Sequence, residues 1–141
     1  MSNLSRMHTA EHILSAVMKK YYAAPRNLEF HLGAKKTKCD YAVPQGLVEQ
    51  DMQQIERLVN AEIEKNHAVT SFMVARKQAQ QYDLWKVPKE AQEIRIVQIG
   101  DFDAQPCGGQ HVANTREIGR FRIMSYDLRE NGRARIRFKV E

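Results

Sequence analysis

The sequence predicts an α+β fold in which a largely antiparallel sheet packs against two long helices. Two stretches, residues 4–22 and 47–66, repeat apolar residues at helical spacing. Several shorter stretches alternate apolar and polar residues between turn signals, which is typical of strands. Long helices mixed with hairpins are typical of the α+β class. A chain of 141 residues fits one domain, residues 1–141, and can bury a core without disulfides.

The first half of the chain supplies both helices and one hairpin. Ser2, Asn3 or Ser5 can cap the helix over residues 4–22, and Pro25 follows its end. Residues 28–43 predict a hairpin that turns at residues 33–36. The second helix, residues 47–66, has the clearest apolar stripe. Its members are Val48, Met52, Ile55, Val59 and Ile63.

The second half is rich in strands. The expected strands are residues 69–74, 94–99, 119–124 and 133–140. Residues 78–85 predict a helix or a turn, which Val87-Pro88 interrupts. Asn131-Gly132 is a strong hairpin signal between the last two strands. Residues 100–103 should turn the chain into the segment that begins at Cys107.

Charge and composition bound the possible partners. Twenty-two Lys and Arg against seventeen Asp and Glu give a net charge of +5, which is compatible with a nucleic-acid partner without requiring one. We find no apolar run long enough to cross a membrane and no signal-peptide core. We therefore expect a cytoplasmic protein with no membrane partner. In that reducing compartment Cys39 and Cys107 should stay unpaired, which leaves Cys107 available as a thiolate ligand.

Two short segments form a candidate zinc site. His8 and His12 are four residues apart on the first helix, so both rings project from one face. Cys107 and His111 enclose Gly108-Gly109 about a hundred residues downstream. Three imidazoles and one thiolate make a tetrahedral set suited to zinc. Each pair alone is weak, because paired histidines are often core or capping residues.

The glycines strengthen this interpretation. Gly108 and Gly109 would let the backbone turn sharply and approach a ligand closely, and Pro106 stiffens the approach. Four protein ligands favour a closed, structural zinc. A histidine-rich set that joins both ends of a domain could instead exchange one ligand for water or substrate. The residues leave both alternatives open.

A competing pattern covers the first segment. Residues 8–12 also match the H-x-x-E-H pattern of inverted zinc peptidases, in which Glu11 would be the general base. Those enzymes are usually much larger, and this interpretation gives Cys107 and His111 no role. We therefore favour the four-ligand site. Glu11 is then either a solvated helix residue or a partner of a ligand histidine.

Three motifs carry a resemblance to a known family. HTAEHIL (8–14), CGGQHVANT (107–115) and EIGRF (117–121) resemble the editing domain of alanyl-tRNA synthetases. The similarity is greatest to the free-standing AlaX proteins and extends more distantly to the editing domain of threonyl-tRNA synthetase. It covers the chain from about Ser5 to Glu141. The family often has Thr where this sequence has Gln110.

The resemblance implies a function and a ligand set. These proteins hydrolyse the ester between a wrong amino acid and its tRNA, chiefly seryl-tRNA(Ala) and in some members glycyl-tRNA(Ala). The family positions carry over to one zinc ion per chain. Its ligands would be His8, His12, Cys107 and His111.

That chemistry suggests roles for other residues. Zinc could activate water or hold the substrate, and backbone N–H groups at Gly108 and Gly109 could stabilise the oxyanion. A polar pocket that bonds the serine hydroxyl would exclude alanine. Its candidates are Thr9, His31 and Gln110. Candidate contacts to tRNA phosphates are Lys35, Lys36, Arg133, Arg135 and Arg137, although these cations could equally be a solvated surface.

Two other functions stay open at this point. The first is editing of another misacylated tRNA. The second is a zinc-stabilised RNA-binding module without turnover. Removing a structural zinc would unfold the domain, whereas removing a catalytic zinc would abolish activity alone. Cys39 is expected to be a buried small apolar residue rather than a nucleophile.

Overall fold

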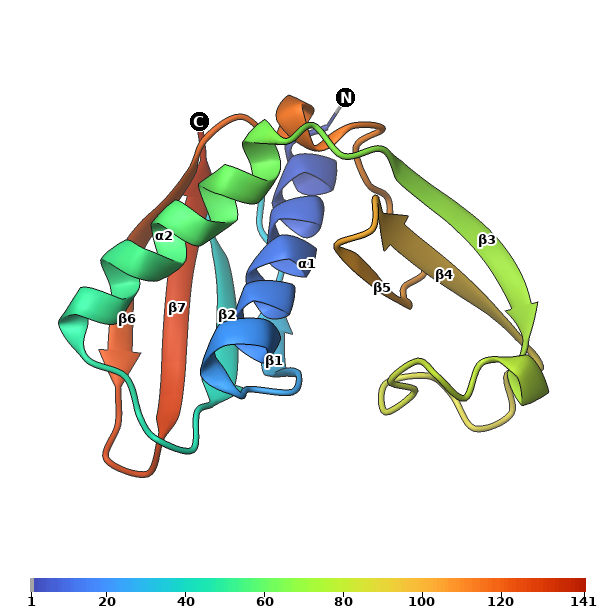
Figure 1. The fold of residues 1–141 in the computed structure, drawn as a ribbon, viewed down its shortest axis with the longest axis horizontal. Helices are drawn as coiled ribbons and strands as arrows, with labels where there is room; N and C mark the ends of the chain where they lie inside the picture. The colour runs from blue at the N-terminus through green and yellow to red at the C-terminus, as the bar shows by residue number, and fades with distance from the viewer. Residues whose placement is uncertain (1) are drawn as a thin grey trace.

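The computed structural model describes residues 2–141 and confirms the α+β class (Figure 1). Both predicted helices are present, and every strand pair is antiparallel. No helix within residues 2–141 combines the length and apolar character needed to cross a membrane. The elements in chain order are α1 (Asn3–Tyr22), β1 (Asn27–His31), β2 (Thr37–Ala42), α2 (Glu49–Glu64), β3 (Val69–Ala75), η1 (Arg76–Gln78), β4 (Glu93–Ile99), β5 (Asp103–Pro106), η2 (Thr115–Ile118), β6 (Phe121–Leu128) and β7 (Arg133–Val140).

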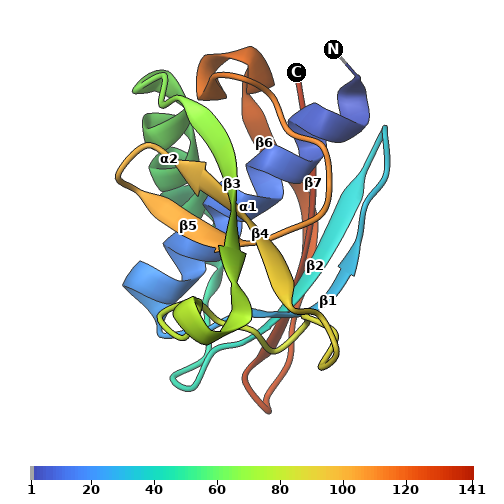
Figure 2. The same ribbon diagram turned by 90° about the vertical axis from the view of Figure 1, so that its right-hand side faces the viewer.

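The strands form two sheets rather than the single sheet expected. One sheet has the order β1-β2-β7-β6 and the other has the order β3-β4-β5. The two lie on opposite sides of α1 in Figure 1, and in Figure 2, turned by 90°, the smaller sheet lies in front of α1. The smaller sheet has a core of its own around Ala79, Ile94 and Ile96. Alternation along a strand predicts the strand but not its partners, so sheet membership could not be predicted.

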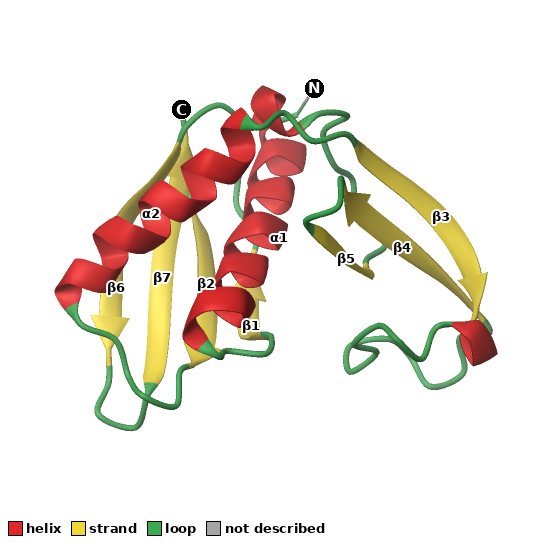
Figure 3. Cartoon of the chain, viewed as in Figure 1, coloured by secondary structure: helices red, strands yellow, loops and turns green. Residues whose placement is uncertain are grey.

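The main core lies between the two helices and one face of the four-stranded sheet (Figure 3). Ser2 caps α1 by accepting the Ser5 N–H at 3.1 Å. Buried residues of α1, including Leu14, pack in one cluster with Ile136 and Phe138 of β7. Because α1 contacts β5 as well as β2 and β7, it packs against both sheets. A side chain on that flank of α1 therefore faces the smaller sheet.

Strand β7 confirms the strict alternation expected of residues 133–140. Its even-numbered residues are buried against the helices, so its arginines lie on the opposite face of the sheet. Gly132 adopts φ 83° in the turn before it, a left-handed conformation that glycine adopts at low cost. The Asn131-Gly132 hairpin is thereby confirmed.

The segment between η1 and β4, residues 79–92, forms turns and irregular structure rather than a helix. Of the two alternatives for residues 78–85, the turn is correct. This segment carries no long apolar stripe that a helix could bury. Arg76 holds its far end by donating from Nη1 to the carbonyls of Pro88 and Ala91, each at 3.0 Å. The two ends of the segment are thus fastened together, and its middle extends towards α1 (Figure 1).

Candidate metal centre

The fold brings together the four proposed metal ligands. His8 and His12 come from α1, and Cys107 and His111 come from the loop after β5. One donor atom from each lies within 4.8 Å of all the others. Cys107 Sγ lies 3.4 Å from His8 Nε2 and 3.5 Å from His111 Nε2. Such a group of three imidazoles and one thiol could hold a metal ion.

The protonation states suit a cation. Burial lowers the pKa of His8 and takes that of His12 well below its usual value. Burial also lowers the pKa of His111, to about 3. All three rings are therefore neutral at pH 7 and can offer a lone pair. Within residues 2–141, His12 Nδ1 is buried without a hydrogen-bond partner, a cost that protein groups alone leave uncompensated. The donor set thus fits the zinc that the sequence implies.

Thr9 fixes the tautomer of His111. Its Oγ1 lies 2.8 Å from the Ser5 carbonyl and 2.9 Å from His111 Nδ1. A hydroxyl carries one proton, and the carbonyl can only accept it. Oγ1 must therefore accept the proton of His111 Nδ1, which leaves Nε2 with its lone pair beside Cys107 Sγ. This hydrogen bond orients a ligand before any ion arrives.

The two glycines of the Cys107 loop do not make the sharp backbone turn that the sequence predicted. The positive-φ glycines in the described chain, residues 2–141, are at other positions, so neither Gly108 nor Gly109 makes a left-handed turn. Gly109 is required for space, because a Cβ there would overlap the His8 ring. A Cβ on Gly108 would meet nothing within 4 Å. Gly108 is therefore the open side of the loop.

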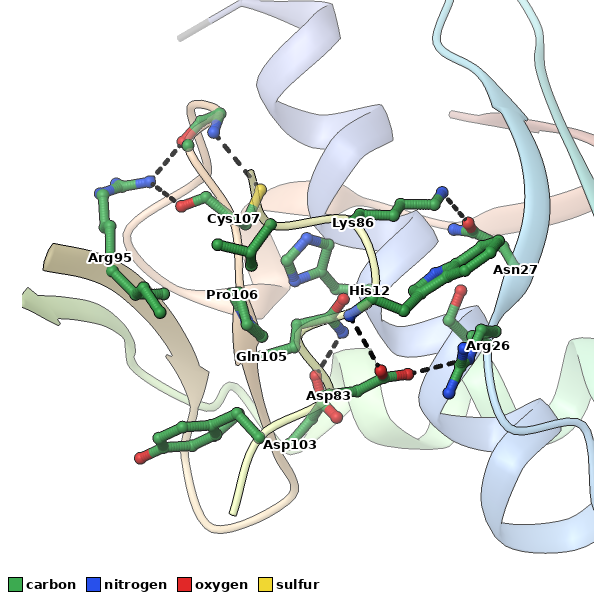
Figure 4. A pocket seen from close by; sticks show the side chains of 18 of the residues that line it. His12, Arg26, Asn27, Asp83, Lys86, Arg95, Asp103, Gln105, Pro106 and Cys107 are labelled. Carbon is green, nitrogen blue, oxygen red and sulfur yellow. Dashed lines mark hydrogen bonds and ion pairs between the residues drawn. The ribbon is translucent and has the colours of Figure 1, made fainter. Parts of the chain in front are cut away.

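Arg95 and a thiol contact hold this loop in place. Arg95 Nη1 donates to the carbonyls of Cys107 at 2.9 Å and Gly109 at 2.8 Å (Figure 4). The Gly109 N–H donates to Cys107 Sγ at 3.3 Å. Burial raises the pKa of the Cys107 thiol. The thiol must therefore lose its proton when it binds a metal.

Glu11 is buried beside the donors, which excludes the solvated alternative. Its Oε2 accepts hydrogen bonds from Ser15 at 2.5 Å and from Asn27 at 2.8 Å. Its Oε1 lies 4.0 Å from His8 Nε2 and 3.9 Å from His12 Nε2. Burial raises the pKa of this carboxyl to about 7. Sequence reasoning did not identify Glu11 as a cavity residue, although its position between two ligand histidines was the available signal.

One cavity of about 550 Å³ opens beside the metal donors (Figure 4). Its walls are the flank of α1, the link from α1 to β1, strands β4 and β5, the Cys107 loop, and residues from the 79–92 segment. Asn27, Trp85 and Arg95 contribute to this lining, and none of them was among the predicted site residues. They were missed because no motif marks them and only the fold brings them to the donors.

The other predicted site residues lie outside the cavity lining. Thr9 is fully buried behind His111, while His31 and Gln110 are exposed on β1 and on the loop. Lys35 and Lys36 are exposed on the β1–β2 turn. The three predicted arginines of β7 lie on the sheet face that the helices do not cover, and acidic partners engage them. Those pairs are Arg133 and Arg135 with Asp40, and Arg137 with Asp127.

Comparisons with known proteins agree with this site. Residues 94–137 match the family model of the threonyl and alanyl tRNA synthetase second additional domain. The chain is 35% identical over 145 residues to the alanyl-tRNA editing protein AlaX-L of Pyrococcus horikoshii, covering 94% of this chain and 33% of AlaX-L.

Alanine–tRNA ligases are similar as well. Identity is 32% over 141 residues for the ligase of Petrotoga mobilis, which covers 92% of this chain and 15% of the ligase. Identity is 31% over 123 residues for the ligase of Neisseria gonorrhoeae, which covers 85% of this chain and 14% of the ligase. The chain thus spans a small part of these ligases and a third of AlaX-L. Together with the four-donor site, these matches confirm the predicted resemblance and group the chain with the AlaX-type editing domains related to alanyl-tRNA synthetases.

Proposed function

We propose that residues 1–141 form a single deacylase domain that removes a wrong amino acid from tRNA(Ala). Seryl-tRNA(Ala) is the first candidate substrate and glycyl-tRNA(Ala) the second. The observation that carries this proposal is the cluster of four metal donors, three of which, His8, His12 and Cys107, line one cavity. The similarity to a protein named as an alanyl-tRNA editing protein supports it. A tRNA substrate would also agree with the net positive charge. A protein with this function would act in the cytoplasm.

The four donors would hold one zinc ion. A bound zinc ion polarises an ester carbonyl and lowers the pKa of water. The protein contributes the positions of the groups around the ester. The Gly109 N–H already donates to Cys107 Sγ, so it is not free to bind an oxyanion. The backbone N–H of Gly108, which borders open space, could do so instead. Arg95 would keep that backbone in place through the two carbonyls it binds.

Selection for serine would depend on the polar wall of the cavity rather than on Thr9, His31 or Gln110. Glu11, Ser15 and Asn27 all line the cavity, and Ser15 and Asn27 both donate hydrogen bonds to Glu11 Oε2. Glu11 Oε1 faces the donors and could accept a hydrogen bond from a serine hydroxyl, which alanine does not have. A site built to bond a hydroxyl discriminates far better than a site that measures one methylene. Glycine has no such group, so we rank it second.

The tRNA body requires a cationic surface outside the cavity. Lys35 and Lys36 are exposed, and we retain them as candidate contacts to the acceptor stem. Arg133, Arg135 and Arg137 already neutralise carboxylates. They also lie on the sheet face opposite the helices. We therefore expect their contribution to tRNA affinity to be smaller than that of the lysines.

Metal removal tests this proposal against the alternative of a non-catalytic RNA-binding module. Protein treated with a chelator should lose deacylation of seryl-tRNA(Ala), keep its circular dichroism spectrum, and recover activity with zinc. Cys107→Ala should lose activity in the same way. Cys39→Ala is the matched control, because Cys39 is fully buried away from the cavity lining. Unfolding on chelation, with no hydrolysis by zinc-loaded protein, would favour the RNA-binding module.

A further inference from the structure

Trp85 occupies an unusual position for a large aromatic residue. It is the only tryptophan of the chain and is 50% exposed. It nevertheless lines the same cavity as the metal donors. An exposed indole in a cavity wall offers a flat apolar face to a flat ligand. The four-donor site does not use this face.

Neighbouring charges hold Trp85 in place. The Arg26 guanidinium lies 4.9 Å from the centre of the Trp85 ring. Asp83 binds Arg26 Nε through Oδ2 at 3.0 Å and accepts the Trp85 backbone N–H through Oδ1 at 3.2 Å (Figure 4). One carboxylate thus orients both the cation and the backbone of the aromatic residue. These contacts connect the 79–92 segment to the link between α1 and β1.

Few side chains separate this stack from the metal donors. Lys86, the residue after Trp85, donates to Asn27 Oδ1 (Figure 4). Asn27 donates to Glu11 Oε2 at 2.8 Å, and Glu11 Oε1 lies 3.9 Å from His12 Nε2. The cavity that joins these groups has a volume of about 550 Å³, within the range that holds a ligand of nucleoside size.

We propose that Trp85, backed by Arg26, stacks the 3′-terminal nucleobase of the tRNA. This inference rests on the proposed deacylase function, because it gives a binding site to the base of the nucleotide that carries the ester. The base is joined to the ribose that carries the amino acid, so a site for it must share a cavity with the metal donors, and Trp85 lines the same cavity as His8, His12 and Cys107. Sites for single-stranded nucleic acids combine an aromatic platform with cations. Lys19 and Lys86 line the same cavity and supply the charge that phosphates require.

The first test uses the fluorescence of Trp85, which is the sole source of tryptophan emission in this protein. The probe is the trinucleotide CCA without an attached amino acid. The comparison is the dinucleotide CC, which lacks the terminal base. CCA should quench the emission with a saturable curve, whereas CC at equal concentration should not. Equal quenching by both would mean that the quenching does not depend on the terminal base, and no saturable quenching by CCA would show that Trp85 does not contact the base. Either result would overturn the proposal.

The second test uses variants with seryl-tRNA(Ala) and with CCA. Trp85→Ala should weaken CCA binding measured by calorimetry about ten-fold or more, and should raise KM with a smaller effect on kcat. Trp85→Phe should restore most of the affinity. Tyr21→Ala is the matched control, because Tyr21 is 58% exposed and lies outside the cavity lining. Unchanged affinity in Trp85→Ala contradicts the stacking site even if deacylation proceeds. Absence of deacylation in wild-type protein that still binds CCA through Trp85 contradicts the proposed function instead.

Discussion

The hydroxyl of Thr9 determines how His111 presents itself to a metal. It gives its proton to the Ser5 carbonyl, and it accepts from His111 Nδ1 and from the Val112 N–H. Thr9→Val keeps the shape and removes these bonds, so the affinity for zinc should fall about 10- to 100-fold. Competition with a chromophoric chelator measures this affinity. Thr9→Ser should retain it, and Thr70→Val, on an exposed site of β3, is the control. Unchanged affinity in Thr9→Val would contradict this role.

The two glycines of the metal loop give a matched pair of variants. In Gly109→Ala the new methyl group would overlap the His8 ring, so His8 must move and zinc affinity should fall at least about ten-fold. Gly108→Ala places its methyl group in open space, and zinc affinity should stay within about two-fold of wild type. The same chelator competition compares the two proteins. Equal affinities would mean that the loop adapts and that Gly109 is not required.

At the scale of single residues, motif spacing predicted which side chains converge but not how they are supported. The four donors come from two motifs whose residue types and spacings suit zinc. The assignment of Thr9 was less accurate, because a buried hydroxyl and one that faces a substrate look alike in a sequence. Trp85 carries no motif at all, and its exposure in the cavity wall is a property of the fold.

The three arginines of β7, Arg133, Arg135 and Arg137, form ion pairs within the protein. Asp40 is 1% exposed, and burial alone would raise the pKa of its carboxyl. Hydrogen bonds from Arg135 and Arg133 outweigh burial and hold this pKa below its usual value. Arg135→Ala should lower the free energy of unfolding by roughly 1–3 kcal/mol, because it removes two bonds to a buried carboxylate. Urea denaturation measures this change.

A surface pair on the same sheet is the control for that variant. Arg122 bonds Glu141 where both side chains are exposed, so Arg122→Ala should cost less than about 1 kcal/mol. If Arg135→Ala left stability unchanged but weakened tRNA binding, the phosphate-contact interpretation of this arginine would replace the structural one.

At the scale of elements, periodicity and turn signals predicted both helices and most strands, and they missed β5 and η2. Helix α2 buries a regular stripe and β7 alternates without interruption, whereas α1 is buried on all sides in its middle, over residues 9–14. Strand β5 has four residues, too few for a pattern, and it pairs only because β4 lies beside it. The separation into two sheets follows from tertiary packing around α1, which local sequence does not encode.

At the scale of the whole molecule, the metal donors join two segments that are far apart in the sequence. Helix α1 starts the chain, and the Cys107 loop lies a hundred residues later. Binding zinc at pH 7 should release between about one and two protons per chain, one from the Cys107 thiol and a fraction from Glu11. The raised pKa of Cys107 keeps that thiol protonated beforehand, and the lowered pKa values of the three histidines leave those rings without a proton to lose.

Calorimetry in buffers with different ionisation enthalpies counts the released protons. Release of three or more would mean that the histidines are protonated in the free protein. Release of none would mean that Cys107 is already ionised or does not bind the ion. Because protons compete with zinc for the thiol, affinity should also increase as the pH rises from 6 to 8.

The most direct test of the central claim is the rate at which zinc-loaded protein deacylates seryl-tRNA(Ala), compared with alanyl-tRNA(Ala) and seryl-tRNA(Ser). Rapid loss of serine from tRNA(Ala), with both other substrates spared, is the predicted result and would establish selection of both amino acid and tRNA. Loss from both seryl-tRNAs would mean that the protein recognises the amino acid alone. No hydrolysis of any of the three would contradict editing of seryl-tRNA(Ala), and glycyl-tRNA(Ala) would then be the remaining substrate of the proposal.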